Sequence, residues 1–241
     1  MKKIFLFILI TSMLFLSSCS NSIDTSESNS FILLRKEVWS GISYDYTYQG
    51  SKLVKIVGSD GYNSNFTYTG DLITKVESVD PQNSFVGHEE YYYSGNNLIQ
   101  IKEYYGTVLN RKIDMIYNND NTRTRTHIYY NGINTTTVYK DFYINEECVK
   151  TQRFNTNGTV ASTINFIYDG YNCKSKNITG YKYIAGWENY DSPFHNILKK
   201  TETSLNMNTV QNFSYEYNSD GYPIKVTTTT SSGVDVGQYY Y

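Results

Sequence analysis

The chain has 241 residues and a nearly balanced charge, with 21 lysines and arginines against 23 aspartates and glutamates. This balance leaves no basic field of the kind that binds nucleic acid, so we expect no nucleic-acid partner. Tyrosine (26 residues) and phenylalanine (11 residues) are abundant beside Thr, Ile, Val, Asn and Gly, a composition that favours strands and turns over helices.

The N-terminus has the features of an export signal. Lys2 and Lys3 precede an apolar run from Ile4 to Phe15, and Leu-Ser-Ser then leads to Cys19. This arrangement resembles a bacterial lipoprotein signal peptide with its lipobox, which implies removal of residues 1–18 and lipidation of Cys19. A transmembrane anchor is the alternative, but it would need about 20 apolar residues and this run is shorter.

Residues 19–30 are too polar to pack, and we expect them to form a flexible tether. Ser20, rather than Asp, follows the cysteine, which by analogy with Gram-negative lipoproteins favours the outer membrane. The mature chain would carry 19 basic and 23 acidic residues. Residues 31–241 are long enough for a single all-β domain with a substantial core.

A hairpin motif recurs along residues 31–241. The pattern Tyr-x-Gly-x-x-[Leu/Ile]-x-x-[Ile/Val] begins at Tyr48, Tyr68 and Tyr93, and weaker copies follow. Each copy places an aromatic strand before a glycine turn and an apolar strand after it, which predicts a β-hairpin. The two apolar positions are three residues apart and would face opposite sides of an unbroken strand. Either the strand carries a bulge, or both faces are partly covered.

The last copy, Tyr217–Val226, has a longer Asn-Ser-Asp-Gly turn. Between the turns of residues 31–241 we count roughly 14 to 17 strands at usual strand and turn lengths. The repeats therefore predict an all-β fold, an antiparallel meander of repeated hairpins forming a barrel or a strongly curved half-barrel.

Arg123 and Arg125 share one strand face, where acids on a neighbouring strand would make them ordinary cross-strand partners.

The hairpin motif loosely resembles the YD repeats of Rhs-type proteins, although among the copies of the motif the literal Tyr-Asp pair occurs only at Tyr168-Asp169. Together with the lipobox and the segment 189–194 (Asn-Tyr-Asp-Ser-Pro-Phe), the chain is similar to a group of uncharacterised Bacteroidota lipoproteins with a barrel-like, porin-like β fold. This resemblance implies a fold and a location and no activity.

Two cysteines remain after Cys19 is assigned to lipid. Cys148 and Cys173 form an even pair in an oxidising compartment, so a cross-strand disulfide is one expectation. Two free, buried thiols are the other, because spacing alone does not decide between them. We expect no metal site, since the pair lacks a second CxxC or nearby His ligands.

One stretch, 186–196, breaks the hairpin rhythm. Pro193 excludes a central strand there, and loops that depart from a repeat are common places for function. We therefore expect a ligand-binding loop, and the alternative is a plug that caps one end of the sheet. Its candidate residues are Trp187, Tyr190, Asp191 and Phe194.

No catalytic spacing is recognisable. His88, His127 and His195 lack HExxH or nucleophile–base partners and are expected on the surface or in turns. Glu89 and Glu90 alternate across a strand and cannot face one reacting atom. The stretch 118–121 is expected to be a plain turn rather than a calcium loop. We expect no enzyme activity, no catalytic residue, no metal and no cofactor.

These observations favour a membrane-anchored lipoprotein that acts as a non-enzymatic binding or structural module, with a glycan, peptide or cell-surface protein as partner. Two alternatives stay open. One is an integral outer-membrane β-barrel for solute passage. The other is a hydrolase whose carboxylates come from distant hairpins.

Overall fold

The computed structural model describes residues 31–241 apart from 82–84, 131, 133 and 186–191. The expected signal peptide and tether lie outside the described residues, together with Trp187, Tyr190 and Asp191 of the expected ligand-binding loop. Residues 31–241 form one compact unit. Within the described ranges, no helix has the length and apolar character needed to cross a bilayer.

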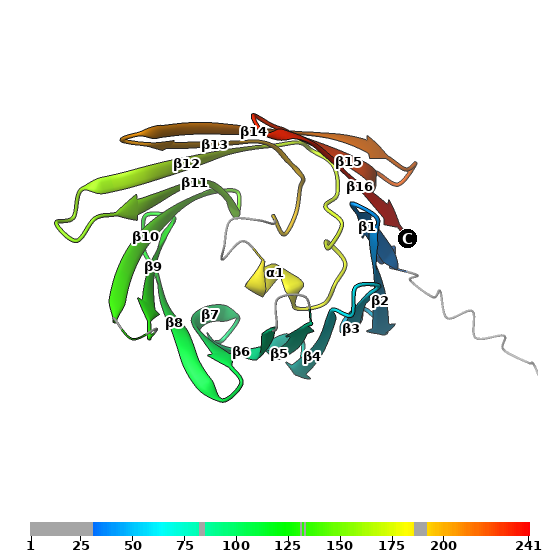
Figure 1. The fold of residues 1–241 in the computed structure, drawn as a ribbon, viewed down its shortest axis with the longest axis horizontal. Coiled ribbons are helices and arrows are strands. Elements are labelled where there is room, and N and C mark those ends of the chain that lie inside the picture. The colour runs from blue at the N-terminus through cyan, green and yellow to red at the C-terminus, as the bar shows by residue number, and fades with distance from the viewer. Residues whose placement is uncertain (1–30, 82–84, 131, 133, 186–191) are drawn as a thin grey trace, which may run out of the picture. The chain divides into compact units, whose positions relative to one another are not determined.

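The described residues form sixteen antiparallel strands that close into a barrel, because β1 pairs with β16 and every other strand pairs with its neighbours in sequence (Figure 1). The prediction of an all-β hairpin meander is confirmed, and it is a closed barrel rather than a half-barrel. The strands are β1 (Lys36–Trp39), β2 (Ile42–Gln49), β3 (Lys52–Gly58), β4 (Asn63–Thr69), β5 (Leu72–Asp80), β6 (Phe85–Ser94), β7 (Asn97–Tyr105), β8 (Val108–Tyr117), β9 (Thr122–Tyr129), β10 (Thr135–Ile144), β11 (Glu147–Phe154), β12 (Val160–Tyr168), β13 (Ile197–Ser204), β14 (Met207–Tyr217), β15 (Pro223–Thr230) and β16 (Gly233–Tyr240).

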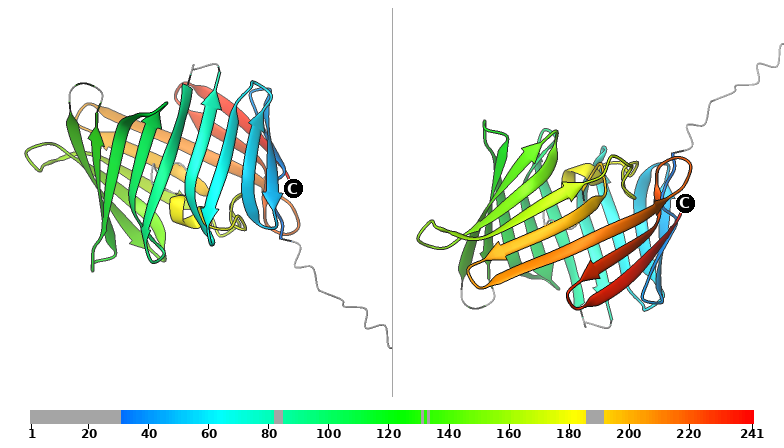
Figure 2. Two further views of the ribbon diagram at one scale, coloured as in Figure 1. Left: turned by 90° about the horizontal axis from the view of Figure 1, so that it is seen from below. Right: turned by 90° about the horizontal axis from the view of Figure 1, so that it is seen from above.

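The two ends of the barrel differ. Turns that follow even-numbered strands lie at one end, which we call the plug end, and turns that follow odd-numbered strands lie at the other, the open end. The connection from β12 to β13 folds into the lumen, and we call its described part, residues 169–185 and 192–196, the inner segment. Figure 1 shows its short helix α1 (Tyr181–Ile184) inside the ring of strands, and Figure 2 shows that α1 lies near one end.

Polar contacts fasten the inner segment to the wall. The Thr179 N–H donates to the carbonyl of Ser51 at 2.9 Å. The ammonium of Lys174 lies 2.9 Å from a carboxylate oxygen of Glu37. On its apolar side, Ile184 packs among buried Ile and Leu side chains of β5, β7 and β8. Protein therefore occupies part of the lumen at the plug end.

The repeated motif encodes a turn and a bulge together. Tyr93 pairs with Leu98 and Tyr92 with Gln100, so Ile99 is an extra residue on β7. This bulge turns Leu98 and Ile101, three residues apart, to the same side, where they are 1% and 0% exposed. The copies that begin at Tyr48 and Tyr68 have the same register shift. Of the two alternatives for this spacing, the bulge is therefore the one found.

The tyrosine at the bulge also links neighbouring hairpins. The Tyr93 hydroxyl donates to the carbonyl of Ile73 on β5 at 2.7 Å, and the Tyr168 hydroxyl donates to the carbonyl of Cys148 at 2.6 Å. The Tyr48 hydroxyl donates in the same way to the carbonyl of Leu34 at 2.7 Å. These carbonyls are shielded from water, so the phenol supplies a hydrogen bond that solvent does not easily replace.

Replacing Tyr93 with phenylalanine is expected to lower the free energy of unfolding by about 1 kcal/mol, because the bond to Ile73 is lost. Tyr92 offers a matched control, since it is exposed and its hydroxyl donates to Glu90 on the outer face. Tyr92→Phe is expected to change stability by less than about 0.5 kcal/mol. Urea unfolding of the two variants compares them, and equal losses would argue against a role for the inward hydroxyl.

The outer face of the barrel is polar. On β2, Asp45, Thr47 and Gln49 are exposed and alternate with tyrosines that are half-buried. Ion pairs also lie on this face, where Lys75 contacts Glu77 at 2.8 Å. Eight lysines of the strands face outward: Lys55, Lys75, Lys102, Lys112, Lys140, Lys150, Lys199 and Lys225. The alternation of β2 thus directs Asp45, Thr47 and Gln49 outward and its tyrosines inward.

Candidate functional site: the lumen of the barrel

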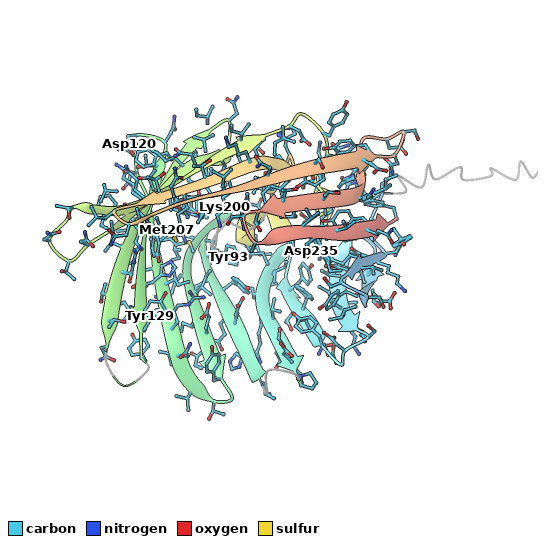
Figure 3. The ribbon with its side chains drawn as sticks, turned by 45° about the horizontal axis from the view of Figure 1, so that its top comes forward. Tyr93, Asp120, Tyr129, Lys200, Met207 and Asp235 are labelled. Atoms are coloured by element: carbon cyan, nitrogen blue, oxygen red, sulfur yellow. The ribbon has the colours of Figure 1, made fainter. Side chains whose placement is uncertain are left out.

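A cavity of about 390 Å³ occupies the lumen toward the open end, and we call it the open-end cavity. Most of its charged lining is cationic. Figure 3 labels two residues of its wall, Tyr129 on β9 and Lys200 on β13. The lining residues are Arg111, Arg125, His127, Tyr129, Tyr139, Thr151, Arg153, Ser162, Ile164, Lys200 and Glu202. Six strands, β8 to β13, contribute them, so the cavity exists only because these strands are curved into a wall.

A buried ion cluster lies beside the open-end cavity. Asp141 on β10 is fully buried and receives hydrogen bonds from Arg125 (Nε to Oδ2 at 2.7 Å, Nη2 to Oδ1 at 2.9 Å) and from Arg123 (Nε to Oδ2 at 3.0 Å). Thr151 on β11 donates a further bond to Asp141 at 2.9 Å. The expectation that Arg123 and Arg125 have an acid on a neighbouring strand is confirmed, and one carboxylate serves both.

The electrostatics of this cluster leave a positive excess. Burial raises the pKa of Asp141, but attraction to Arg125 and then Arg123 outweighs it, so the pKa lies below its ordinary value. The carboxyl is therefore ionised at neutral pH and offsets one of the two guanidinium charges. Arg123 borders a second cavity and Arg125 the open-end cavity, so the cluster separates the two spaces.

Two more arginines of the open-end cavity have their side chains oriented by neighbours. Arg111 on β8 forms a two-point contact with Glu103 on β7, with Nε donating to Oε2 at 2.6 Å. Its guanidinium lies 5.7 Å from the centre of the Tyr129 ring. Arg153 on β11 has its Nε 3.5 Å from the Ser162 hydroxyl. Both guanidinium groups are thereby directed toward the lumen.

His127 borders the open-end cavity as a neutral ring. Burial, and next the charge of Arg125, lower its pKa to about 3. Its Nε2 lies 3.4 Å from Nη1 of Arg125, and because a guanidinium only donates, Nε2 must accept. The proton then resides on Nδ1, a buried atom for which the described residues offer no hydrogen-bond partner. The expectation that His127 lies on the surface or in a turn is wrong, because β9 directs it inward at 3% exposure.

The second cavity, the plug-end cavity, measures about 720 Å³ and lies beside the inner segment. Asparagines and tyrosines of the plug-end turns and adjacent strands dominate its described lining. Phe194 of the expected ligand-binding loop lines it, with Lys182 and Tyr183 of α1. The structure therefore brings Phe194 to a cavity, while the other three expected residues of that loop lie outside the described ranges.

Pro193 and Phe194 belong to a short bend that side chains hold in place. The Ser192 hydroxyl donates to Glu147 on β11 at 2.7 Å and accepts from the N–H of Phe194 at 3.2 Å. His195 lies 3.1 Å from the other oxygen of Glu147. This bend lies in the lumen against β11, which fits the plug alternative weighed for 186–196.

Solved structures include a barrel that is similar to this one. The barrel resembles that of a porin-like protein from Bacteroides vulgatus ATCC 8482, with a TM-score of 0.60 and 10% sequence identity over 87% of this chain and 98% of that chain. The chain has a porin-like barrel fold. A porin-like protein from Bacteroides uniformis ATCC 8492 also matches, with a TM-score of 0.39 and 11% identity over 83% of this chain and 77% of that chain. No family model matches, and no curated protein matches in sequence.

The porin-like fold confirms the barrel that the resemblance to Bacteroidota proteins implied. At this level of identity the likeness shows the fold alone. The lipoprotein signal and the resemblance to YD repeats remain predictions.

The residues for which no catalytic or metal-binding role was expected lie in separate places. His88 stacks on Tyr104 on the outer face, with ring centres 4.4 Å apart. Glu89 and Glu90 point to opposite faces, since Tyr91 inside donates to one and Tyr92 outside to the other. In the 118–121 turn, Asn118 N–H bonds the carbonyl of Thr122 at 2.8 Å. Among the described residues no three His, Cys, Asp or Glu side chains gather in a metal-binding group.

Both remaining cysteines are free thiols, so the disulfide alternative is not found in this structure. Cys148 on β11 lies 3.5 Å from Thr151 Oγ1, whereas Cys173 in the inner segment lies 3.6 Å from Ser175 Oγ. The physical reason is placement, because one cysteine belongs to the wall and the other to the segment inside it. Burial raises the pKa of the Cys148 thiol, which makes it a poor nucleophile at neutral pH.

Sequence reasoning missed the open-end cavity. Arg123 and Arg125 were recognisable as a same-face pair, but Arg111, Arg153 and Lys200 come from three other strands. None has a local motif. Counting the cations that face inward on each strand would have found them. Such a count requires the positions of the bulges, because the bulges determine which residues face inward.

Proposed function

We propose that the protein is a non-enzymatic binding module of the cell envelope, held to the outer membrane by lipid on Cys19, with its barrel in water and its ligand site in the lumen. The single observation that carries the proposal is the distribution of polarity. The outward face of the strands carries eight lysines, several of them paired with acids, while the lumen holds the apolar core, the inner segment and a cavity whose arginines are held by buried carboxylates.

A barrel wall in contact with lipid needs an outward apolar band about 25 Å tall. Lys75 and Lys112 stand near the middle of β5 and β8 and face outward. A lysine on the lipid face near the bilayer midplane costs about 2–4 kcal/mol. For Lys75 and Lys112 together the cost is about 4–8 kcal/mol, which is comparable with the whole stability of a typical domain, about 5–15 kcal/mol. Exposed apolar residues do occur, but Ile116 and Ile167 each follow an outward polar neighbour two positions earlier, Asp114 and Asn165.

The inner segment argues against solute passage as the function. It packs into the core through Ile184 and is bonded to the wall at Ser51 and Glu37. A conducting lumen would need this packing to break. The likeness to a porin-like protein is a likeness of fold and supports an envelope location without requiring conduction.

The lumen carboxylates support binding rather than catalysis. A glycosidase acid needs a raised pKa, and Asp141 has the reverse because two guanidinium groups hold it ionised. Glu103 is engaged in a two-point contact with Arg111. Both acids serve to position arginines, which is an arrangement typical of a recognition site.

Expression of residues 31–241 without lipid or detergent tests the proposal. We expect a folded, monodisperse protein in aqueous buffer. A domain that needs detergent to remain in solution would contradict the proposal and favour the integral barrel. The anchor is tested separately, by palmitate labelling of the full chain in a bacterial host, where Cys19→Ser should abolish the label. A label that persists in Cys19→Ser would remove the lipoprotein assignment.

A further inference from the structure

We propose that the open-end cavity binds a small organic oxyanion, a carboxylated or phosphorylated sugar no larger than about a disaccharide. This deepens the proposed function and rests on it, because it assumes that the lumen is the binding site. Three properties of the cavity carry the inference: its charge, the orientation of its hydrogen-bond donors and its size.

The charge around the cavity is positive in a chain that is negative overall. Five cations, Arg111, Arg123, Arg125, Arg153 and Lys200, stand in or beside it against three carboxylates, Glu103, Asp141 and Glu202, which leaves an excess of two positive charges. The whole chain has a formal charge of −2. Glu89 on β6 pairs in register with Glu103 and lies two strands beyond the lining, which begins at β8. The excess is thus local, and low dielectric surroundings strengthen its pull on an anion.

The arginines are held before any ligand arrives. Glu103 fixes Arg111 and Asp141 fixes Arg125, each through two parallel N–H···O contacts. The Arg125 guanidinium also lies 5.0 Å from the centre of the Tyr139 ring. Guanidinium groups held in this way present planar N–H forks, and such forks suit carboxylate and phosphate oxygens. Preorganised donors also reduce the entropy cost of binding.

His127 adds a donor with a defined proton. Its Nε2 accepts from Arg125, so its Nδ1 carries hydrogen, and no described residue accepts that hydrogen. A buried donor without an acceptor costs about 1–3 kcal/mol. The ring borders the cavity, so an acceptor atom of a ligand, with a small adjustment of the neighbouring rings, would relieve that cost.

The volume sets the size of the ligand. Small-molecule sites commonly measure about 300–1,000 Å³, and the open-end cavity, at about 390 Å³, lies near the lower limit. The faces of Tyr129 and Tyr139 are taken up by Arg111 and Arg125, which leaves little ring surface for a stacked neutral sugar. Oxyanion contacts, rather than stacking, should therefore supply the affinity.

Isothermal titration of the purified full chain tests the inference with three probes: a disaccharide of two uronic acid units, glucose 6-phosphate and the neutral disaccharide maltose. We expect at least one charged probe to bind with a Kd of about 1 mM or tighter, more weakly as salt is raised, while maltose does not bind. The two charged probes distinguish a carboxylate from a phosphate ligand.

Variants locate the site. Lys200→Gln and Arg153→Gln should each weaken the bound probe by about tenfold, equivalent to about 1.4 kcal/mol. Lys199→Gln is the matched control, because Lys199 precedes Lys200 on β13 and faces outward, and it should leave the Kd unchanged. Circular dichroism confirms that all three variants fold.

The inference is overturned if neither charged probe binds below about 10 mM, if maltose binds as tightly, or if Lys199→Gln weakens binding as much as Lys200→Gln. These outcomes are independent of the detergent test. A barrel that is soluble without detergent and binds no anion would retain the proposed water-exposed location and lose this ligand class.

Discussion

Replacing Asp141 with asparagine is expected to lower the free energy of unfolding by about 3–5 kcal/mol, because the change leaves two buried guanidinium groups without their counter-charge. Asp141 is completely buried, and Arg125 and Arg123 bond to it at 2.7 and 3.0 Å. Asparagine preserves the shape of the side chain but can accept at only one of the two oxygen positions. Urea denaturation monitored by circular dichroism measures the loss.

Asp114→Asn is the matched control. Asp114 lies on the outer face of β8 and pairs with Lys112 at 2.8 Å, where both side chains are partly exposed. Solvent screens such a pair, so the control should lose less than about 1 kcal/mol. If the two variants lost the same amount, the buried cluster would not be the source of the stability.

The same cluster makes stability depend on pH in one direction. The folded pKa of Asp141 is depressed by Arg125 and Arg123 against the opposing effect of burial. Its contribution is therefore full above the unfolded carboxyl pKa of about 3.9 and is lost as the pH falls through the folded value. Asp141→Asn should remove this part of the acid sensitivity, so the difference in stability between the wild type and the variant should shrink below about pH 4.

Local chemistry explains which parts of this fold were readable from the sequence. Gly50, Gly70 and Gly95 all have positive φ and lie in two-residue turns. Each hairpin was therefore recognisable from a few neighbouring residues in the sequence. The spacing of Leu98 and Ile101 narrowed the strand geometry to two alternatives. Closure of the barrel was not readable, because it depends on β1 meeting β16, nearly the whole domain apart in sequence.

The site was less predictable than the fold for a related reason. The sequence placed Arg123 and Arg125 on one face of a strand but did not identify their partner. Asp141 is identified only by the register of β10 on β9. Residues 169–185 were another omission. The sequence did not distinguish them from the hairpin array, because Tyr168-Asp169-Gly170 resembles one more turn. In the structure the chain enters the lumen at this point, and Asp169 accepts a hydrogen bond from the N–H of Asn196 at 3.0 Å.

Replacing Gly180 with alanine is expected to detach the inner segment from the wall and to lower the free energy of unfolding by about 2–5 kcal/mol. Gly180 has a φ of +77°, and a Cβ there would lie 2.4 Å from the carbonyl oxygen of Asp71 and 3.3 Å from the nitrogen of Ile73. The positive φ costs a non-glycine residue about 1–2 kcal/mol, and the clash with backbone atoms adds about 1–3 kcal/mol.

Gly158→Ala separates these two effects. Gly158 has a similar φ of +82°, in the turn between β11 and β12, but no atom lies within 4 Å of its Cβ position. The control should therefore lose only the conformational part, about 1–2 kcal/mol. Hydrogen exchange at the Thr179 amide, which bonds to Ser51, gives a second readout. It should accelerate in Gly180→Ala beyond the effect on global stability and should follow global stability in Gly158→Ala. Equal behaviour of the two variants would mean that the inner segment does not depend on close contact with the β4–β5 turn. The proposal that the inner segment closes the lumen to solute would then lose its main support.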